Sequence, residues 1–219
     1  MSKKILVTGS AGHLGEALIR TFNESGVESV GIDIKPSDFT DCTGSIADRL
    51  FVQNCMADCD AVIHTATLHK PHVGTHSRQD FIDTNVTGTL NLLEEAVNNK
   101  CRAFIYTSTT STFGDAMRPK AGDPAVWVTE NLQPIPKNIY GVTKTTAEDL
   151  CSLFFRNTSM PCIVLKTSRF FPEEDDAKRQ RDQFEDANLK VNELLFRRAD
   201  IADIVTAHRL ALHLSLIHI

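Results

Sequence analysis

The chain has 219 residues and a formal net charge of -5, with 42% hydrophobic and 23% charged residues, which is typical of a globular protein with a sizeable core. Lys and Arg are spread along the sequence without a cluster that could follow a phosphate backbone, so nucleic acid is an unfavoured partner. No apolar run approaches the roughly 20 residues of a membrane helix, and residues 1–4 lead directly into a strand pattern. We therefore expect no membrane association and a cytoplasmic protein.

The cysteines show no disulfide-framework spacing, and most lie in apolar runs where Cys acts as a small hydrophobe. Cys55 and Cys59 stand one helical turn apart and lack the Cys-x-x-Cys spacing of zinc sites. We expect reduced thiols and no metal.

Short apolar segments alternate with helical patterns along the chain. Strands are predicted at Ile5–Val7, Ser29–Asp33, Ala61–Thr65, Ala103–Thr107 and Ile163–Thr167. Helical stripes follow the first strand up to Gly26, then run from Phe81 to Val97 and from Tyr140 to Phe155. This alternation predicts an α/β fold with a Rossmann-like, doubly wound parallel sheet over residues 1–167, followed by a small C-terminal substrate-binding part over residues 168–219.

A glycine-rich turn joins the first strand to the first helix. Residues 8–15 read Thr-Gly-Ser-Ala-Gly-His-Leu-Gly. Backbone N–H groups at such a turn and the helix dipole can hold a pyrophosphate, and a side chain would block its approach. The residues expected to bind a dinucleotide here are Gly9, Ser10, Gly12, His13, Leu14 and Gly15.

An acidic residue, Asp33, ends the second predicted strand. Its carboxylate can accept hydrogen bonds from the adenosine ribose hydroxyls and would repel a 2'-phosphate, so NAD is expected rather than NADP. Two alternatives weaken this preference for NAD. Asp33 can be a simple turn residue, and the positive charge of the neighbouring Lys35 can reduce the repulsion of a 2'-phosphate.

Tyr140 and Lys144 stand four residues apart, one turn along the same helical face. A tyrosine titrates near 10, so acid or base work near neutrality requires lowering its pKa by about 3 units, or roughly 4 kcal/mol. A close ammonium and an oxidised nicotinamide can supply that. An exposed tyrosine beside a solvated lysine is the plain alternative for this spacing.

A run of hydroxyl residues, 107–112, follows the fourth predicted strand and is displayed where ligands of such sheets bind. His69, His72 and His76 form a second polar group. Pro71 and Gly74 interrupt a regular helix there, so we expect a substrate-side loop rather than a metal site.

Taken together, these motifs resemble the extended short-chain dehydrogenase/reductase superfamily, in its NAD-dependent epimerase/dehydratase branch. The elements that carry the resemblance are the turn at residues 8–15, Asp33, the Asp-Ala-Val-Ile-His-Thr-Ala run at 60–66, the Asn-Val-Thr-Gly-Thr run at 85–89, Phe113-Gly114 and residues 140–144.

The resemblance implies roles for the catalytic residues. Tyr140 is the implied proton donor or acceptor, and Lys144 binds the nicotinamide ribose and lowers the tyrosine pKa. Thr109 is the implied hydrogen-bonding partner of the reacting oxygen, with Ser111 as the less favoured holder of that role, and Asn85 supports the site.

The resemblance also implies further contacts to NAD. Ser45 and Ile46 are expected to flank the adenine, although the family more often has an acid where Ser45 stands. The cofactor cleft is expected to be lined by Thr65, Ala66 and Thr67, and the preceding His64 is expected to be a packed structural histidine.

Departures from the family pattern narrow the expected chemistry. Dehydratases of this branch carry Asp-Glu after the catalytic threonine, where this chain has Thr110 and Ser111, so dehydration is disfavoured against epimerisation or plain oxidoreduction. Nucleotide-sugar epimerases have Arg-x-Phe-Asn after the last predicted strand, where this chain has Arg169-Phe170-Phe171-Pro172, so the asparagine is missing, and the acidic run Glu173–Asp186 follows. A sugar or a nucleotide sugar stays the expected substrate.

The last part of the chain resembles the segment that returns to the cofactor domain, with Asp203 as the expected helix cap and a helix expected over Asn188–Arg198. Family members continue further, so we expect a truncated sequence whose closing residues, 214–219, are non-native. Pairing of the Asn85 and Tyr140 helices into a homodimer is also implied. A non-catalytic dinucleotide sensor is the rival interpretation, which an intact set of catalytic residues disfavours.

Overall fold

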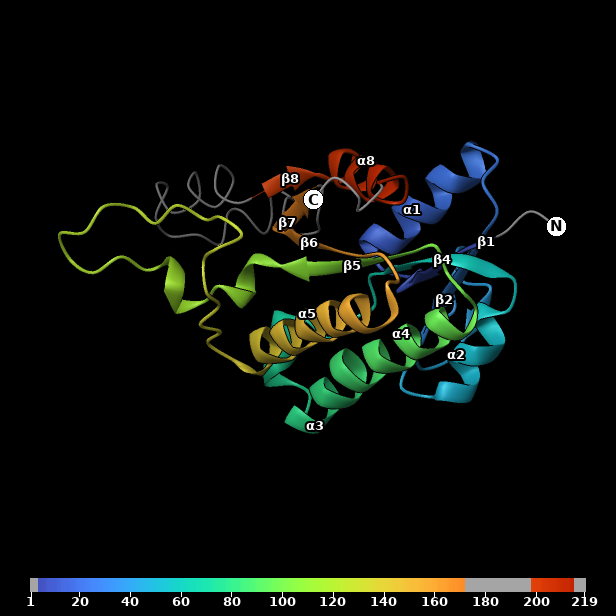
Figure 1. Ribbon diagram of the computed structural model, residues 1–219, viewed down its shortest axis with the longest axis horizontal. Helices are drawn as coiled ribbons and strands as arrows, with labels where there is room; N and C mark the ends of the chain where they lie inside the picture. Colours follow the sequence, from blue (N-terminus) through green and yellow to red (C-terminus); the bar gives the residue numbers. More distant parts are fainter. Residues whose placement is uncertain (1–3, 172–197, 215–219) are drawn as a thin grey trace.

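The protein is described by a computed structural model that covers residues 4–171 and 198–214 (Figure 1). Six parallel strands form one sheet in the order β3-β2-β1-β4-β5-β6. The strands are β1 (Lys4–Thr8), β2 (Ser29–Asp33), β3 (Cys42–Thr43), β4 (Cys59–His64), β5 (Ala103–Thr109) and β6 (Cys162–Thr167). This arrangement confirms the predicted fold class of a Rossmann-like, doubly wound sheet.

Helices cover both faces of the sheet (Figure 1). One face carries α1 (His13–Glu24) and α8 (Ile201–Ala211), which pack against each other. The other carries α2 (Arg49–Met56), α4 (Gly88–Asn98) and α5 (Ile139–Thr158). Among these described residues no helix is long and apolar enough to span a membrane.

The strands separate two hydrophobic clusters because successive side chains point to opposite faces of a sheet. Leu6 and Val62 face the cluster beneath α2, α4 and α5. Val7 and Ile63 face the cluster beneath α1 and α8. Burial on both sides explains why the strands read as continuous apolar runs rather than alternating ones.

The functional edge of the sheet lies where β1 pairs with β2 on one side and with β4 on the other. The chain winds in opposite directions from this point, so the connections after β1 and β4 diverge, and ligands of such sheets bind there, at the carboxyl ends of the strands. Thr8 and His64, the last residues of β1 and β4, are paired in register there.

Short irregular helices surround that edge. They are η1 (Lys70–Gly74), α3 (Arg78–Phe81), the π-helix η2 (Ile82–Thr87), η3 (Thr110–Thr112) and η4 (Asp115–Met117). The long helical stripe predicted from Phe81 to Val97 is thus one π-turn continuing into α4.

The C-terminal segment departs from expectation in its details. Asp200 is the N-cap of α8, and its Oδ1 accepts a 2.8 Å hydrogen bond from Ala202 N. The expectation that Asp203 is the cap was wrong, because the helix begins earlier and Asp203 lies in its first turn. Arg198 begins β8 (Arg198–Asp200), which pairs with β7 (Arg169–Phe171), so the helix expected over Asn188–Arg198 does not include it.

Three segments lie outside the described part of the chain: residues 1–3, 172–197 and 215–219. The second segment holds the whole acidic run at 173–186 and all of the expected helix at 188–198 except Arg198. Within the described part, α8 packs on the hydrophobic cluster beneath α1, where Val205, Ala211 and Leu212 join Val7 and Leu18.

Candidate active site

The turn after β1 is shaped so that only glycine fits at two of its positions. Gly9 has a φ of +74°, and a Cβ added to it would lie 2.8 Å from both Ala66 N and Thr65 Oγ1. A Cβ on Gly15 would lie 2.0 Å from the Gly9 carbonyl oxygen. These contacts bring α1 directly against the turn and leave its backbone bare.

The N-terminus of α1 faces the same turn. Gly12 is the N-cap and gives the first turn no side-chain hydrogen bond. His13 is exposed and its ring lies 6.2 Å from that of Phe170, whereas Leu14 is buried. Ser10 is also buried, and its hydroxyl bonds that of Thr40 at 2.8 Å. The uncapped N–H groups and the bare glycines therefore fit an anionic diphosphate.

Asp33 lies beside this turn at the end of β2. Its Oδ2 accepts from Ala11 N at 3.1 Å, and its Oδ1 accepts from Lys35 N at 2.9 Å. The carboxylate is thus fixed by backbone donors, next to the place where the diphosphate fits, and fits a ribose diol better than a 2'-phosphate.

The segment after β4 lies beside the end of β1. Thr65 Oγ1 donates to the Thr8 carbonyl at 2.6 Å, and Ala66 N donates to Thr8 Oγ1 at 3.1 Å. Thr67 Oγ1 donates to Asn85 Oδ1 at 3.0 Å. The three residues expected at the cofactor cleft therefore tie β1, β4 and η2 together at the functional edge.

The residues expected near the adenine lie after β3. Ser45 is exposed, and its hydroxyl accepts from Ala47 N at 3.2 Å. Ile46 is buried, and its side chain fills the space beside Gly88. The Ile46 carbonyl accepts from Asn91 Nδ2 at 3.0 Å, so this turn is fixed to α4.

Tyr140 lies in the first turn of α5, which begins at the N-cap Asn138, whose Oδ1 accepts from Gly141 N at 3.0 Å. The Tyr140 side chain is buried and hydrogen-bonds that of Thr109 at the end of β5. Thr109 Oγ1 accepts from Ser111 N at 3.1 Å, which leaves its O–H to donate toward the phenol oxygen. Two hydroxyls from different elements thus converge.

Lys144 lies one turn further along α5 and is 2% exposed. Its Nζ donates to the Thr107 carbonyl at 2.7 Å and lies 4.1 Å from the centroid of the Tyr106 ring. Burial lowers the pKa of Lys144 to about 7, and the negative charge of Glu148 acts against that change.

The pKa of Tyr140 corrects one expectation. Burial raises it above its ordinary value, and the hydrogen bond from Thr109 acts in the opposite direction. The lowered phenol pKa expected from Lys144 is therefore not a property of these residues by themselves, because the ammonium is directed to the Thr107 carbonyl.

Asn85 is buried in η2, where the π-turn brings its amide into the site. Its Oδ1 accepts from Leu68 N at 2.8 Å, and its Nδ2 donates to the Leu68 carbonyl and to Thr143 Oγ1, each at 3.0 Å. Asn85 therefore fastens the segment after β4 to α5.

The histidines from β4 to α3 lie in two places, His64 in the core and the other three around η1. His64 is 1% exposed, with Nδ1 2.7 Å from Thr8 Oγ1 and Nε2 3.0 Å from Thr89 Oγ1, the packed arrangement that was expected. The rings of His69 and His72 stack at η1 with centroids 4.6 Å apart, and His76 meets His72 edge to face at 5.0 Å. Over residues 4–171 and 198–214, no three His, Cys, Asp or Glu side chains are arranged so that they could hold a metal ion.

Sequence patterns missed several residues around the site. Glu148, Lys166 and Ser108 form a polar network beside Lys144, and His208 Nε2 lies 2.8 Å from Thr107 Oγ1. Ser108 lies in the hydroxyl run noted above, and Glu148 stands one helical turn after Lys144, whereas Lys166 and His208 had no local signal.

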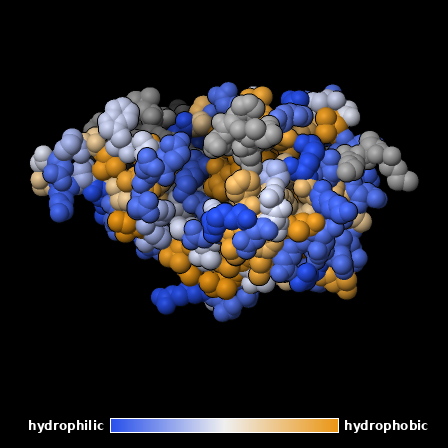
Figure 2. All heavy atoms as spheres, viewed as in Figure 1, coloured by the Kyte–Doolittle hydropathy of each residue, from blue (hydrophilic) through white to orange (hydrophobic). Residues whose placement is uncertain are grey.

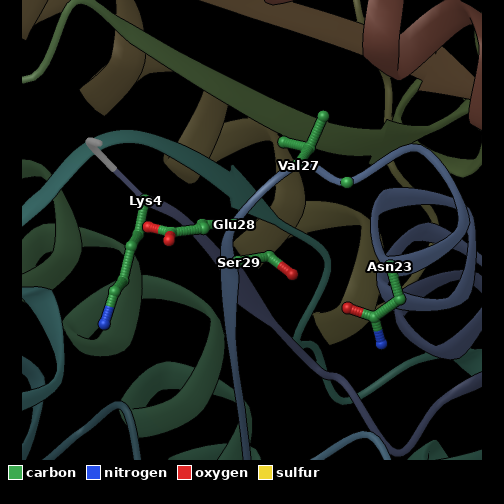
Figure 3. Close-up of a pocket in the computed structure, with 6 residues that line it drawn as sticks. Lys4, Asn23, Val27, Glu28 and Ser29 are labelled. Carbon is green, nitrogen blue, oxygen red and sulfur yellow. The ribbon is translucent and has the colours of Figure 1, made fainter.

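A separate hollow of about 480 Å³ lies at the opposite edge of the sheet, where β1 and β2 begin (Figure 3). It is lined by Lys4, Asn23, Gly26, Val27, Glu28 and Ser29. None of the expected site residues lines it, so it is distinct from the catalytic edge.

Comparisons with known proteins agree with this geometry. Residues 5–211 match the NAD dependent epimerase/dehydratase family. Among curated proteins, the chain is 28% identical to dTDP-D-glucose 4,6-dehydratase of Dictyostelium discoideum, with 77% of this chain and 44% of that protein covered. It is 26% identical to UDP-glucose 4-epimerase 2 of Oryza sativa, with 74% of this chain and 43% of that protein covered. The chain spans about half the length of such relatives.

Solved structures show the same fold. A short-chain dehydrogenase/reductase superfamily protein of Agrobacterium tumefaciens with bound NAD superposes with a TM-score of 0.78 at 23% identity, with 95% of this chain and 73% of that one covered. UDP-glucuronic acid 4-epimerase of Bacillus cereus in complex with NAD superposes with a TM-score of 0.72 at 25% identity, with 96% of this chain and 74% of that one covered. The chain belongs to the NAD dependent epimerase/dehydratase family.

Proposed function

We propose that this chain is the NAD-binding and catalytic part of an epimerase or dehydrogenase that acts on a hydroxyl-bearing carbon of a sugar-like substrate. The observation that carries this proposal is the convergence of the Tyr140 and Thr109 hydroxyls beside the buried ammonium of Lys144. These groups lie at the carboxyl edge of the sheet, which also carries the bare glycine turn.

The residues present fit NAD, the cofactor of the family. The uncapped first turn of α1 would hold the diphosphate, and Asp33 would hold the adenosine ribose. Ser45 and Ile46 would lie near the adenine, and Thr65, Ala66 and Thr67 would border the nicotinamide half. When bound, NAD supplies a hydride acceptor.

The chain's own residues would handle the proton. Tyr140 would take the proton of the substrate hydroxyl as its carbon is oxidised, and return it when a carbonyl is reduced. Thr109 would hydrogen-bond the same oxygen and hold it in line with the phenol. Lys144 would hold the nicotinamide ribose, and Asn85 would keep α5 in place.

This role requires the phenol to become more acidic than it is in the structure, where burial raises its pKa. The positive charge of oxidised nicotinamide and an ammonium turned toward the site would stabilise the phenolate. The lowered pKa is thus proposed as a property of the loaded enzyme.

The residues after Thr109 favour epimerisation or net oxidoreduction. Elimination of water needs an acid and a base beside the hydride site, and this chain has Thr110 and Ser111 there. The relatives named above include both a dehydratase and an epimerase, so the choice rests on these two positions.

We propose a sugar or a sugar nucleotide as the substrate, since the names of the relatives specify nucleotide sugars. Residues 168–219 would supply the substrate side, with residues 1–167 as the NAD-binding domain. The asparagine missing after Phe171 weakens the case for a nucleotide diphosphate relative to a free sugar.

We further propose a homodimer paired through the Asn85 and Tyr140 helices, in the cytoplasm. Hydrophobic side chains gather over α4 and α5 in Figure 2, and Val142, Leu153 and Phe155 of α5 are more than two-fifths exposed. None of the cysteines of the described part of the chain forms a disulfide, which suits a reducing compartment.

A substrate screen tests the proposal. Sugars and sugar nucleotides are incubated with the purified protein and NAD, while the absorbance of reduced nicotinamide and the stereochemistry of the product are followed. An epimerised product without net reduced cofactor supports an epimerase, and stoichiometric reduced cofactor supports a dehydrogenase. Tight NAD binding without turnover of any substrate would favour the non-catalytic sensor instead.

A further inference from the structure

An ion pair lies near the Tyr140 and Lys144 side chains. Lys166 Nζ on β6 lies 2.6 Å from Glu148 Oε2 on α5, and the two side chains are 28% and 12% exposed. The other carboxylate oxygen of Glu148 accepts a short hydrogen bond from the Ser108 hydroxyl. None of the proton-handling steps proposed above uses this pair.

The geometry connects the pair to the catalytic residues through β5. Lys144 and Glu148 stand one turn apart on the same face of α5. Lys144 holds the carbonyl of Thr107, and Glu148 holds the hydroxyl of Ser108. The two side chains therefore fasten consecutive residues of β5 to α5, directly before Thr109.

Lys166 keeps the carboxylate in place from the other side. Its Nζ also donates to Thr112 Oγ1 at 3.2 Å and lies 4.6 Å from the centroid of the Phe113 ring. The Glu148 carboxylate thus has fixed partners on β5 and β6, one helical turn from Lys144.

Lys144 needs such a neighbour because its ammonium has little contact with water. Burial disfavours its charged form, and Glu148 is the larger of the neighbouring charges that favour it. The titratable groups around it, on α5, β4, β5 and the segment before η1, are His64, His69, Tyr106, Tyr140, Glu148 and Cys151.

We propose that Glu148, held by Lys166 and Ser108, is a positioning residue that fixes Lys144 and Thr109 relative to each other and serves as the counter-charge of the Lys144 ammonium. The inference rests on the role of Lys144 in the proposed function. It adds a named residue whose effect on the reaction passes through another side chain.

The direct test is an NMR titration of the lysine side chains in the full chain, with Lys144 assigned by its loss in Lys144→Met. In Glu148→Gln the midpoint of Lys144 is expected to fall by roughly one pH unit, since an opposite charge has been removed. The measurement needs no substrate, so failure of the proposed reaction would leave it readable.

A purely structural role is separated by a matched set of variants. Glu148→Gln leaves Lys166 without its partner and should lower Tm by roughly 5–10 °C. Glu148→Gln combined with Lys166→Gln should recover most of that loss while the Lys144 midpoint stays lowered. Lys166→Gln alone should raise the midpoint, because the positive charge that neutralises Glu148 is removed while the carboxylate and its Ser108 contact remain.

Glu148→Asp, which keeps the charge, should restore the midpoint at least in part. A Lys144 midpoint that is the same in the parent and in both folded Glu148→Gln proteins would overturn the proposal. If Glu148→Gln does not fold, the double variant and Lys166→Gln serve as the test. A Lys144 midpoint that is unchanged in both would contradict the role of Glu148 as the counter-charge.

Discussion

Lys144 Nζ donates a 2.7 Å hydrogen bond to the main-chain carbonyl of Thr107, two residues before Thr109. This bond joins the helix that carries the phenol to the strand that carries the second hydroxyl. The relative placement of Tyr140 and Thr109 therefore depends on contacts between α5 and β5.

Tyr140→Phe removes the proposed proton carrier and keeps the ring. Turnover is expected to fall by about 10² to 10⁴, the range associated with a positioned acid or base. NAD affinity should stay within about threefold, since one hydroxyl is lost from a site held mainly by backbone groups. Steady-state kinetics and calorimetric titration with NAD check both expectations. Retained turnover would remove Tyr140 from the mechanism.

Gly15→Ala places a methyl group 2.0 Å from the Gly9 carbonyl oxygen, so α1 must move away from the turn. We expect a loss of about 1–3 kcal/mol in the free energy of unfolding and at least tenfold weaker NAD binding. Gly26→Ala is the matched control, because nothing lies within 4 Å and only its φ of +67° is strained. It should lose about 1 kcal/mol of stability with NAD affinity intact. Equal NAD binding by the two variants would contradict the role of the turn.

Asp33→Asn should shift cofactor preference. The charge that would repel a 2'-phosphate is lost while the size of the side chain is kept, so the ratio of NADP to NAD affinity is expected to rise at least about tenfold. Dissociation constants for both nucleotides, measured in the same buffer, give the ratio. An unchanged ratio would mean that Asp33 serves only as the turn residue that accepts from Ala11 N and Lys35 N.

Tyr106→Phe should stabilise the protein. The Tyr106 hydroxyl is buried and has no hydrogen-bond partner within the part of the chain that the structure describes. Removing it abolishes a desolvation cost and keeps the ring beneath Lys144, so the free energy of unfolding should rise by about 1 kcal/mol. Urea denaturation measures it. Tyr140→Phe is the comparison, since its hydroxyl is hydrogen-bonded and its removal should not stabilise.

Acid should weaken the fold through its buried histidines. Burial lowers the pKa of His64 and of His208 below the ordinary value of 6.5. The unfolded chain therefore takes up protons first as the pH falls below about 6.5, which favours unfolding. The free energy of unfolding should drop by about 1.4 kcal/mol per pH unit for each histidine in that range.

His208→Gln checks the assignment. It should be less stable at pH 8, because the Thr107 hydroxyl loses its partner, and should show a shallower fall in stability between pH 6.5 and pH 5. The same slope in the variant and the parent would assign the acid sensitivity to other groups.

Much of the fold followed from local patterns. The apolar runs located five of the six strands of the main sheet, and the glycine turn located the start of α1. β3 was missed because Cys42–Thr43 is too short to carry a pattern, and its place is set by pairing with β2. The π-turn at Asn85 was missed because its side chains keep the helical stripe of the segment.

The polar network was harder to predict because its members are far apart in sequence. Ser108 and Glu148 are 40 residues apart, and Thr107 and His208 are 101 apart. Nothing local marks Lys166 as the partner of Glu148; the pairing arises only when β6 is placed beside β5. The direction of the Tyr140 pKa likewise depends on burial, which the residue spacing does not reveal.

A crystal structure of the protein grown with NAD tests the central claim most directly. The account predicts the diphosphate against residues 9–15, the adenosine ribose at Asp33 and the nicotinamide ring beside the hydroxyl of Tyr140, with Lys144 at the ribose. Crystals that take up no NAD at millimolar concentrations, or a nicotinamide ring remote from Tyr140, would contradict it.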